Sequence, residues 1–164
     1  MNDDYKKLIE SALSKKEENK KLLKQLRKQK DNKIDNLFHQ LHEEVFDEID
    51  CLQCANCCST SSPIFYQRDI ERLAKHLKMK PGAFIEQYLH IDEDNDYVLN
   101  ETPCPFLMPD NYCMVYNARP TACREYPHTN RKRIKQIFSL TLKNSEICPA
   151  VALIFEKINQ SLDK

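Results

Sequence analysis

The sequence predicts a mainly α protein: a small, cysteine-rich domain with irregular loops and an N-terminal helical extension. Its 164 residues include a single glycine, Gly82, where average usage of roughly 7% would supply many more, and this disfavours an all-β fold built on tight glycine turns. Apolar residues recur at helical spacing over several segments. Residues 103–127 hold five of the eight prolines, so this region is expected to lack long regular elements.

Five segments are expected to be helical because their apolar residues fall on one face: residues 34–49, 67–78, 81–90, 131–143 and 149–161. The pattern is strongest in 34–49, whereas 131–143 is ambiguous between helix and strand, with helix favoured. Pro81 and Pro149 suit the first turns of their helices. The polar residues of helix 67–78 are expected to point outward: Arg68, Asp69, Glu71 and Lys75.

An acidic run at residues 92–96 resembles a calcium loop at first sight. Tyr97 stands where that loop needs glycine, and Pro103 stands where it needs a bidentate glutamate. The run is therefore expected to be a turn before a short strand over residues 97–99. His39 and His42, three residues apart, are a weaker candidate for a shared ion, because the cysteines already supply enough ligands.

The first part of the chain differs in composition from the rest. Residues 1–35 carry eleven Lys and Arg and seven Asp and Glu, with only a thin helical stripe of apolar residues. We expect a polar helical arm over 1–33 and a cysteine-cluster domain over 34–164, with residues 1–30 too poor in apolar side chains to join the core. The alternative is a basic arm for RNA or a partner, which the interleaved acidic residues disfavour.

Composition also bears on compartment and partners. One glycine cannot build a glycine-rich phosphate cradle, and a net charge of zero gives no general attraction to nucleic acid or anionic lipid. The N-terminal residues include no apolar signal region, and no apolar run approaches the roughly 20 residues of a membrane span. We therefore expect a cytoplasmic protein that binds no membrane, and we do not expect it to bind nucleic acid. In that compartment cysteines stay reduced, so ligation of metal is favoured over disulfides.

The spacing of the cysteines is the strongest signal in the sequence. A run C-x2-C-x2-C-C is followed by four cysteines farther along the chain, and the full set is Cys51, Cys54, Cys57, Cys58, Cys104, Cys113, Cys123 and Cys148. In C-x2-C the chain turns so that both sulfurs face one ion. The side chains of Cys57 and Cys58 cannot face the same way, so they are expected to serve two metals, or one of them to bridge.

Eight thiols make two sets of four, which is the number for two zinc sites with four cysteine ligands each, or for two 4Fe-4S clusters. The first three cysteines match the start of the bacterial ferredoxin run C-x2-C-x2-C-x3-C-P. The Cys-Pro pairs at 104–105 and 148–149 lean modestly toward iron–sulfur. The sequence therefore predicts a metal-clasped domain in which downstream cysteines share metal with the run, and the choice between zinc and iron stays open.

The motifs around the cysteines are Cys51-Leu52-Gln53-Cys54-Ala55-Asn56-Cys57-Cys58, Cys104-Pro105-Phe106-Leu107, Tyr112-Cys113-Met114-Val115-Tyr116, Arg119-Pro120, Cys123-Arg124-Glu125-Tyr126-Pro127 and Cys148-Pro149. Together they resemble the YkgJ-like cysteine-cluster family, to which zinc or iron chelation is ascribed. The resemblance implies metal binding and little more. Members often have glycine after the second cysteine of the run, where this chain has Ala55.

Two arginines near Cys123 are candidate cofactor-binding residues. Four thiolates on Zn²⁺ or on a cubane core leave a net charge of −2, which Arg119 and Arg124 can offset or hydrogen-bond. The alternative is that they form ordinary ion pairs, for example with Glu125. A second basic patch, His128 with residues 131–133, is a weaker candidate for an anion or RNA.

The sequence thus predicts a non-catalytic protein that chelates zinc or iron, with metal replacing part of the core of residues 51–150. The alternative is an iron–sulfur redox module that assists modification of a protein or RNA. We find no nucleophile–base pair and no cofactor loop in the sequence, which leans away from an enzyme. The partner is expected to be the metal ion, and no protein partner is indicated.

Overall fold

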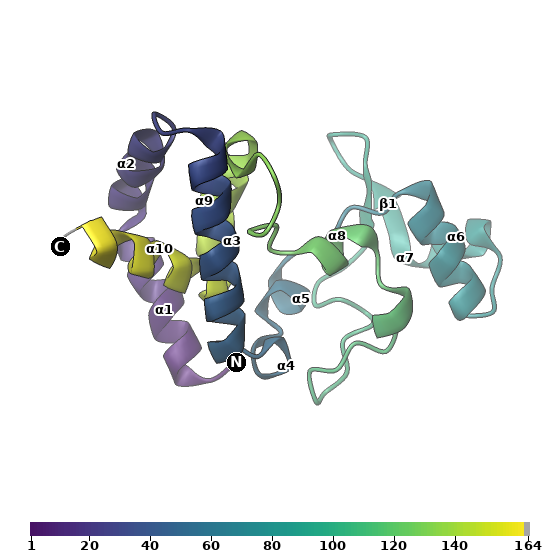
Figure 1. The fold of residues 1–164 in the computed structure, drawn as a ribbon. Coiled ribbons are helices and arrows are strands. Elements are labelled where there is room, and N and C mark those ends of the chain that lie inside the picture. The colour runs from purple at the N-terminus through teal and green to yellow at the C-terminus, as the bar shows by residue number, and fades with distance from the viewer. Residues whose placement is uncertain (163–164) are drawn as a thin grey trace. The chain divides into compact units, whose positions relative to one another are not determined.

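The computed structural model describes residues 1–162, and the chain forms two compact units (Figure 1). Unit 1 combines Met1–Cys54 with Pro127–Lys164, and unit 2 is Ala55–Tyr126. Helices dominate both units, and a single two-stranded sheet is found in the described residues. The prediction of a mainly α protein is confirmed.

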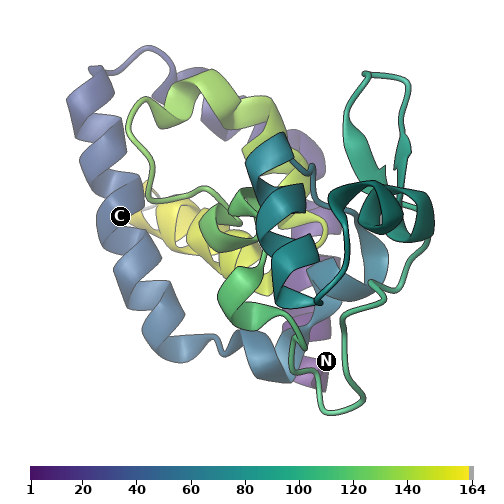
Figure 2. The ribbon, with the colours of Figure 1, turned by 90° about the vertical axis from the view of Figure 1, so that its right-hand side faces the viewer.

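Unit 1 is a helical unit made from both ends of the chain. Its elements are α1 (Asp3–Ser14), α2 (Lys16–Leu26), α3 (Asp31–Glu48), α4 (Cys51–Cys54), the 3-10 helix η2 (Ile134–Ile137), α9 (Phe138–Ser145) and α10 (Pro149–Leu162). Helix α10 packs against α1, α3 and α9, as Figures 1 and 2 show. Among the most deeply buried side chains of its core are Phe38, Phe138 and Phe155.

The starts of two helical elements in unit 1 are set by polar side chains. The Asn2 side chain accepts a hydrogen bond from the backbone amide of Tyr5 at 2.9 Å and so caps α1. The carboxylate of Asp35 on α3 accepts hydrogen bonds from the amides of Arg133 and Ile134 at 2.8 and 3.0 Å. These bonds join α3 to the start of η2, about a hundred residues later in the chain.

The N-terminal helices contribute to the core of unit 1. Tyr5 on α1 and Leu22, Leu23 and Leu26 on α2 are buried in the same cluster as the apolar residues of α3 and α10. The expectation that residues 1–30 are too poor in apolar side chains to join the core is therefore wrong. The few apolar residues of these lysine-rich helices fall on one face, and that face is covered by α9 and α10.

Unit 2 is smaller and less regular. Its elements are α5 (Asn56–Thr60), α6 (Gln67–His76), α7 (Pro81–Tyr88), β1 (Leu89–Ile91), β2 (Tyr97–Leu99), the 3-10 helix η1 (Tyr116–Ala118) and α8 (Thr121–Glu125). Strands β1 and β2 are antiparallel, with Leu89 opposite Leu99 and Ile91 opposite Tyr97. The core lies between α6, α7 and the aromatic rings of Phe65, Phe84 and Phe106.

The predicted elements agree with the structure except at some boundaries. Helices α3, α6, α7 and α10 occupy the predicted segments to within three residues at each end, and the strand over 97–99 is present. The predicted helix 81–90 ends two residues early, because Leu89 and the residue after it belong to β1 and pair with the predicted strand. The acidic run forms the turn between the strands, where Asp92 accepts hydrogen bonds from the amides of Asp94 and Asp96.

Residues 131–143 divide between the loop before η2, η2 itself and most of α9, in line with the preference for helix over strand. Within residues 1–162 no single helix is long and apolar enough to cross a membrane, although the bent pair Ile134–Ser145 and Pro149–Ser161 together has the required length and composition.

Candidate metal centre

The eight cysteines are divided between the units. Unit 1 contains Cys51, Cys54 and Cys148, and unit 2 contains Cys57, Cys58, Cys104, Cys113 and Cys123. All eight lie in the described part of the chain, and none is in a disulfide. Cys51 is exposed and the other seven are half-buried.

Four cysteines of unit 2, namely Cys58, Cys104, Cys113 and Cys123, form what we call the unit 2 thiol group. Burial, with smaller contributions from the charges of the other three thiols, raises the pKa of Cys123 to about 12. Burial also raises the pKa of Cys104 to about 11, again with contributions from Cys58 and Cys113. The four sulfurs are therefore within electrostatic reach of one another, although they are far apart in sequence.

The backbone holds this group together and directs amides at its sulfurs. The amide of Cys104 donates to the carbonyl oxygen of Cys58 at 2.8 Å, which ties the downstream cysteines to the run. The amides of Phe106 and Leu107 donate to the sulfur of Cys104, and the amide of Val115 donates to the sulfur of Cys113. Amides directed at sulfur stabilise the thiolate form, which is the form that binds metal.

Each of these two sulfurs belongs to a tight turn. The carbonyl of Cys104 accepts from the amide of Leu107 at 3.0 Å, and the carbonyl of Cys113 accepts from the amide of Tyr116 at the same distance. The segment between the turns folds back on itself, because the amide of Met114 donates to the carbonyl of Phe106 at 2.8 Å. The proline-rich region thus lacks long elements, as predicted, yet it holds two of its cysteines in defined positions.

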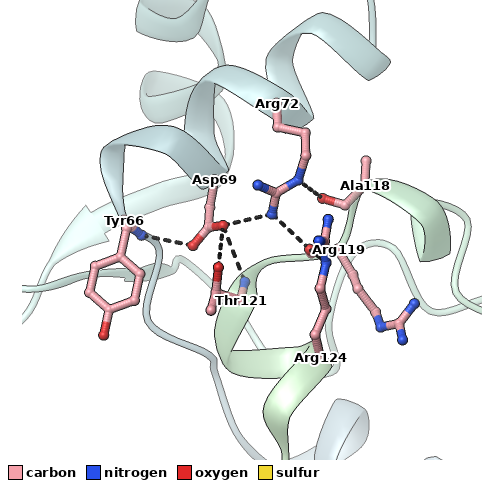
Figure 3. Close-up of polar contacts among 7 residues, drawn as sticks. All are labelled: Tyr66, Asp69, Arg72, Ala118, Arg119, Thr121 and Arg124. Carbon is pink, nitrogen blue, oxygen red and sulfur yellow. Dashed lines mark hydrogen bonds and ion pairs between the residues drawn. The ribbon is translucent and has the colours of Figure 1, made fainter.

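Cys123 lies on α8, and the start of α8 is held by α6 (Figure 3). The side chain of Asp69 is fully buried and accepts four hydrogen bonds. The donors are the Tyr66 amide at 3.2 Å, the Arg72 guanidinium at 2.6 Å, and the amide and hydroxyl of Thr121 at 3.2 and 2.9 Å. Since Thr121 is the first residue of α8, the carboxylate holds the beginning of the helix that carries Cys123.

Arg72 completes this connection. Besides Asp69, its guanidinium donates to the carbonyl oxygens of Ala118 at 3.2 Å and Arg119 at 2.9 Å. The prediction that Asp69 points outward is therefore wrong, because Arg72 and the distant residue Thr121 both donate to its carboxylate inside the unit. One sequence feature could have indicated this burial: an acid and an arginine stand three residues apart on one helix, and the acid is beside the apolar residue Ile70.

Arg119 and Arg124, the two candidate cofactor-binding arginines, both lie close to this segment. The guanidinium of Arg119 is 3.8 Å from the ring centroid of Tyr116 and donates to the Tyr116 carbonyl at 2.7 Å. Its positive charge opposes the rise in the pKa of Cys113 and Cys123. Arg124 donates to the carbonyl of Arg119 at 3.1 Å. A role for either arginine toward a bound cofactor stays a prediction.

The remaining three cysteines, Cys51, Cys54 and Cys148, form the unit 1 thiol group. Cys51 and Cys54 are the first and last residues of α4, and Cys148 directly precedes α10. The sulfur of Cys148 accepts hydrogen bonds from the amides of Ala150 and Val151 in the first turn of α10. Burial, with smaller contributions from the charges of Cys54 and Cys51, raises the pKa of Cys148 to about 12.

The two adjacent cysteines of the run lie in unit 2, and their sulfurs are in contact with each other. The sulfurs of Cys57 and Cys58 are 4.0 Å apart, and a hydrogen bond from the Cys57 thiol lowers the pKa of Cys58. Before them, Ala55 adopts a left-handed conformation with φ of 47°, which reverses the chain direction after Cys54. The candidate His42 is engaged elsewhere, because its ring nitrogen is 2.7 Å from the hydroxyl of Thr129.

The donor chemistry of the thiol groups fits a thiophilic metal. Thiolates are soft ligands that suit zinc and iron–sulfur clusters, and four of them complete a tetrahedral site. Among residues 1–162, however, no three Cys, His, Asp or Glu side chains are already arranged at ligand positions around one point. The fold therefore brings the thiols within electrostatic reach of one another, and metal binding requires their side chains to move to ligand positions.

Grouped, half-buried thiols with amides directed at their sulfurs are typical of a cysteine-rich metal-binding domain. Residues 50–149 match the model of the CxxCxxCC family, described as "Putative zinc- or iron-chelating domain". The match covers more than half of the chain, and the protein belongs to this family. Neither a search of curated proteins nor a search of solved structures found a match.

Proposed function

We propose that the protein chelates zinc or iron through the thiolates of its eight cysteines, and that the unit 2 thiol group is the principal centre. One observation carries this proposal: the fold of unit 2 brings Cys58 of the run together with Cys104, Cys113 and Cys123. The unit 1 thiol group is a second chelating group, and Cys57 is a further ligand.

The electrostatics of the thiols support a binding site for a cation. Burial raises the pKa of Cys104 and Cys123 well above neutral pH, so without metal these groups hold their protons. A divalent cation displaces the protons because it supplies the positive charge that a buried thiolate needs. Amides at the sulfurs and the nearby charge of Arg119 favour the same thiolate form. Metal binding is then accompanied by proton release.

A second candidate function is an iron–sulfur redox module that assists modification of a protein or RNA. The observation that favours it is the ferredoxin-like spacing of Cys51, Cys54 and Cys57 together with the two Cys-Pro pairs. Hydrogen bonds to sulfur of the kind seen at Cys104 also tune cluster potentials. In either case the thiols require a reducing compartment, in keeping with a cytoplasmic protein.

The test is purification of the full chain without oxygen, followed by metal and sulfide analysis. A colourless protein with zinc supports simple chelation, whereas a brown protein with iron and sulfide supports the second candidate. Cys113→Ser should remove metal from the unit 2 thiol group, and Ser59→Ala, which leaves every thiol intact, is the control. A reduced chain that contains no metal and takes up neither Zn²⁺ nor iron would overturn the proposal.

A further inference from the structure

We propose that Asp69 and Arg72 on α6 are positioning residues for the unit 2 thiol group, and that they set its metal affinity by fixing Cys123. This inference rests on the proposed function, because it concerns the same thiols. Neither side chain carries a metal-binding atom into the group, so both act through the segment that bears Cys123.

Helix α8 cannot position Cys123 alone. It has only five residues, Thr121–Glu125, and two backbone bonds enclose it, from the Arg124 amide to Pro120 and from the Tyr126 amide to Ala122. A helix of this length is unstable in water without outside contacts. Its position must therefore come from the residues that hold its ends.

Helix α6 supplies contacts that hold the start of α8. Asp69 accepts from both the amide and the hydroxyl of Thr121, and Arg72 donates to the carbonyls of Ala118 and Arg119. The segment from 118 to 121 is thus held by four hydrogen bonds from two side chains (Figure 3). We call these four hydrogen bonds from Asp69 and Arg72 the clamp. Cys123 follows two residues after Thr121 on the same short helix, so its backbone position depends on the clamp.

The side chain of Arg72 is chemically suited to this set of contacts. The guanidinium of Arg72 is planar and offers several donors in a fixed geometry, so it can contact Asp69 and two carbonyls at once. Lysine has the same charge but cannot make this set of contacts. Because Asp69 and Arg72 form an ion pair, the clamp also adds no net charge beside the thiols. Its influence on metal binding is therefore geometric.

A metal site is sensitive to such positioning, because ligand distances must be correct to within about 0.2 Å. Loss of groups that orient ligands typically lowers metal affinity by about 10- to 100-fold. We expect a loss of this size from Asp69→Asn, Arg72→Lys and Thr121→Ala. Thr121→Ser keeps the hydroxyl that donates to Asp69 and should retain wild-type affinity.

The experiment uses the full, reduced chain and two probes, Co²⁺ and Zn²⁺, in anaerobic titrations. Subtracting the Co²⁺ spectrum of Cys113→Ser isolates the contribution of the unit 2 thiol group, and Zn²⁺ affinity is measured by competition. The control is Glu71→Gln on the same helix, whose carboxylate accepts a hydrogen bond from Gln67 at the protein surface. Arg72→Lys and Thr121→Ala should weaken Zn²⁺ binding and shift the Co²⁺ thiolate bands, whereas Glu71→Gln should change neither.

The outcomes separate the two proposals. If the wild-type chain binds neither ion, the proposed function and this inference both fail. If the wild-type chain binds and Arg72→Lys and Thr121→Ala bind equally well with the same spectrum, the inference fails and the proposed function stands. A purely structural role would lower the melting temperature while leaving the spectrum of the bound Co²⁺ unchanged. Equal losses in Thr121→Ser and Thr121→Ala would also contradict the inference, because the hydroxyl would then not be the link.

Discussion

The phenol oxygen of Tyr5 accepts a hydrogen bond from the backbone amide of Asp50, 45 residues later in the chain, at 2.9 Å. Asp50 immediately precedes Cys51, and its carboxylate accepts a bond from the amide of Leu52 at 2.9 Å. The first helix of the protein is thus in direct contact with the residue that leads into the cysteine run.

Tyr5→Phe should destabilise unit 1 by about 1 kcal/mol, because the ring stays buried and only the acceptor for the Asp50 amide is lost. Denaturant unfolding of the full chain measures this change. Tyr112→Phe is the matched control, because Tyr112 is 43% exposed, and the unfolding free energy of this variant should not change. Equal behaviour of the two variants would show that the phenol of Tyr5 contributes nothing.

The packing of the N-terminal helices predicts a large difference between two leucines. Leu26 is 2% exposed in the core of unit 1, whereas Leu13 is 47% exposed. Leu26→Ala should cost about 2–5 kcal/mol, the usual range for removing a buried leucine. Leu13→Ala should stay within about 0.5 kcal/mol of wild type. Similar, small losses for both would restore the view of residues 1–30 as an arm outside the core.

The left-handed residue in the cysteine run predicts a stabilising change. Ala55 has φ of 47°, and this conformation costs an L-residue about 1–2 kcal/mol. Ala55→Gly removes that strain but frees the unfolded chain, so we expect a net gain of up to about 1 kcal/mol. Ala74→Gly, within helix α6, should instead destabilise by at least about 1 kcal/mol. Destabilisation by Ala55→Gly would contradict the strain argument.

The buried carboxylate in unit 2 predicts a dependence of stability on pH. Burial alone would raise the pKa of Asp69, but hydrogen bonds from Arg72, Thr121 and the Tyr66 amide outweigh it and lower the pKa. The folded state therefore prefers the charged form. Its stabilisation is fully present above the unfolded pKa of about 3.9 and is lost as the pH falls through the lower folded value.

The measurement compares the reduced, metal-free chain with Asp69→Asn in urea between neutral pH and about pH 3. The stability advantage of the wild-type chain should be constant above about pH 5 and should shrink below about pH 4. An advantage that grows on acidification would mean that the folded pKa of Asp69 is raised, which would contradict the hydrogen-bond pattern.

Removal of metal should affect the two units unequally. Structural zinc can contribute on the order of 10 kcal/mol to folding, and the proline-rich segment of unit 2 buries few large apolar side chains. A chelator under reducing conditions should strongly reduce hydrogen-exchange protection over residues 55–126, where only the small apolar core of unit 2 remains to hold the fold. Helices α3 and α10 should stay protected, because they share the apolar core of unit 1. Equal loss of protection in both units, or in neither, would contradict this prediction.

The local sequence pattern was sufficient to predict the long amphipathic helices, but it could not predict interactions between distant segments. Helix α3 follows from the spacing of its apolar residues, and Pro149 marks the start of α10. The outward prediction for Asp69 failed because a helical pattern carries no information about Thr121, its partner 52 residues later. A carboxylate is buried only where such donors meet it, and this depends on tertiary structure.

For the cysteine run, too, the local sequence predicts some features, whereas others depend on distant segments. Its spacing predicts chelation, and the different side-chain directions at Cys57 and Cys58 predict that they serve two metals or that one of them bridges. Which downstream cysteines accompany Cys58 is decided by the turns at Cys104 and Cys113 and by the position of α8. Neither the two turns nor the position of α8 has a sequence pattern strong enough to predict which cysteines lie near Cys58.

The division into units affects the order in which the chain can fold during its synthesis on the ribosome. Unit 2 is continuous, whereas unit 1 needs Pro127 and the residues after it to complete its core around Leu26 and Phe155. During synthesis all four cysteines of the unit 2 thiol group emerge before α10 exists. A metal ion that binds the group as proposed would meet it while the first three helices still lack their principal partner. We therefore expect loading of unit 2 to precede the folding of unit 1.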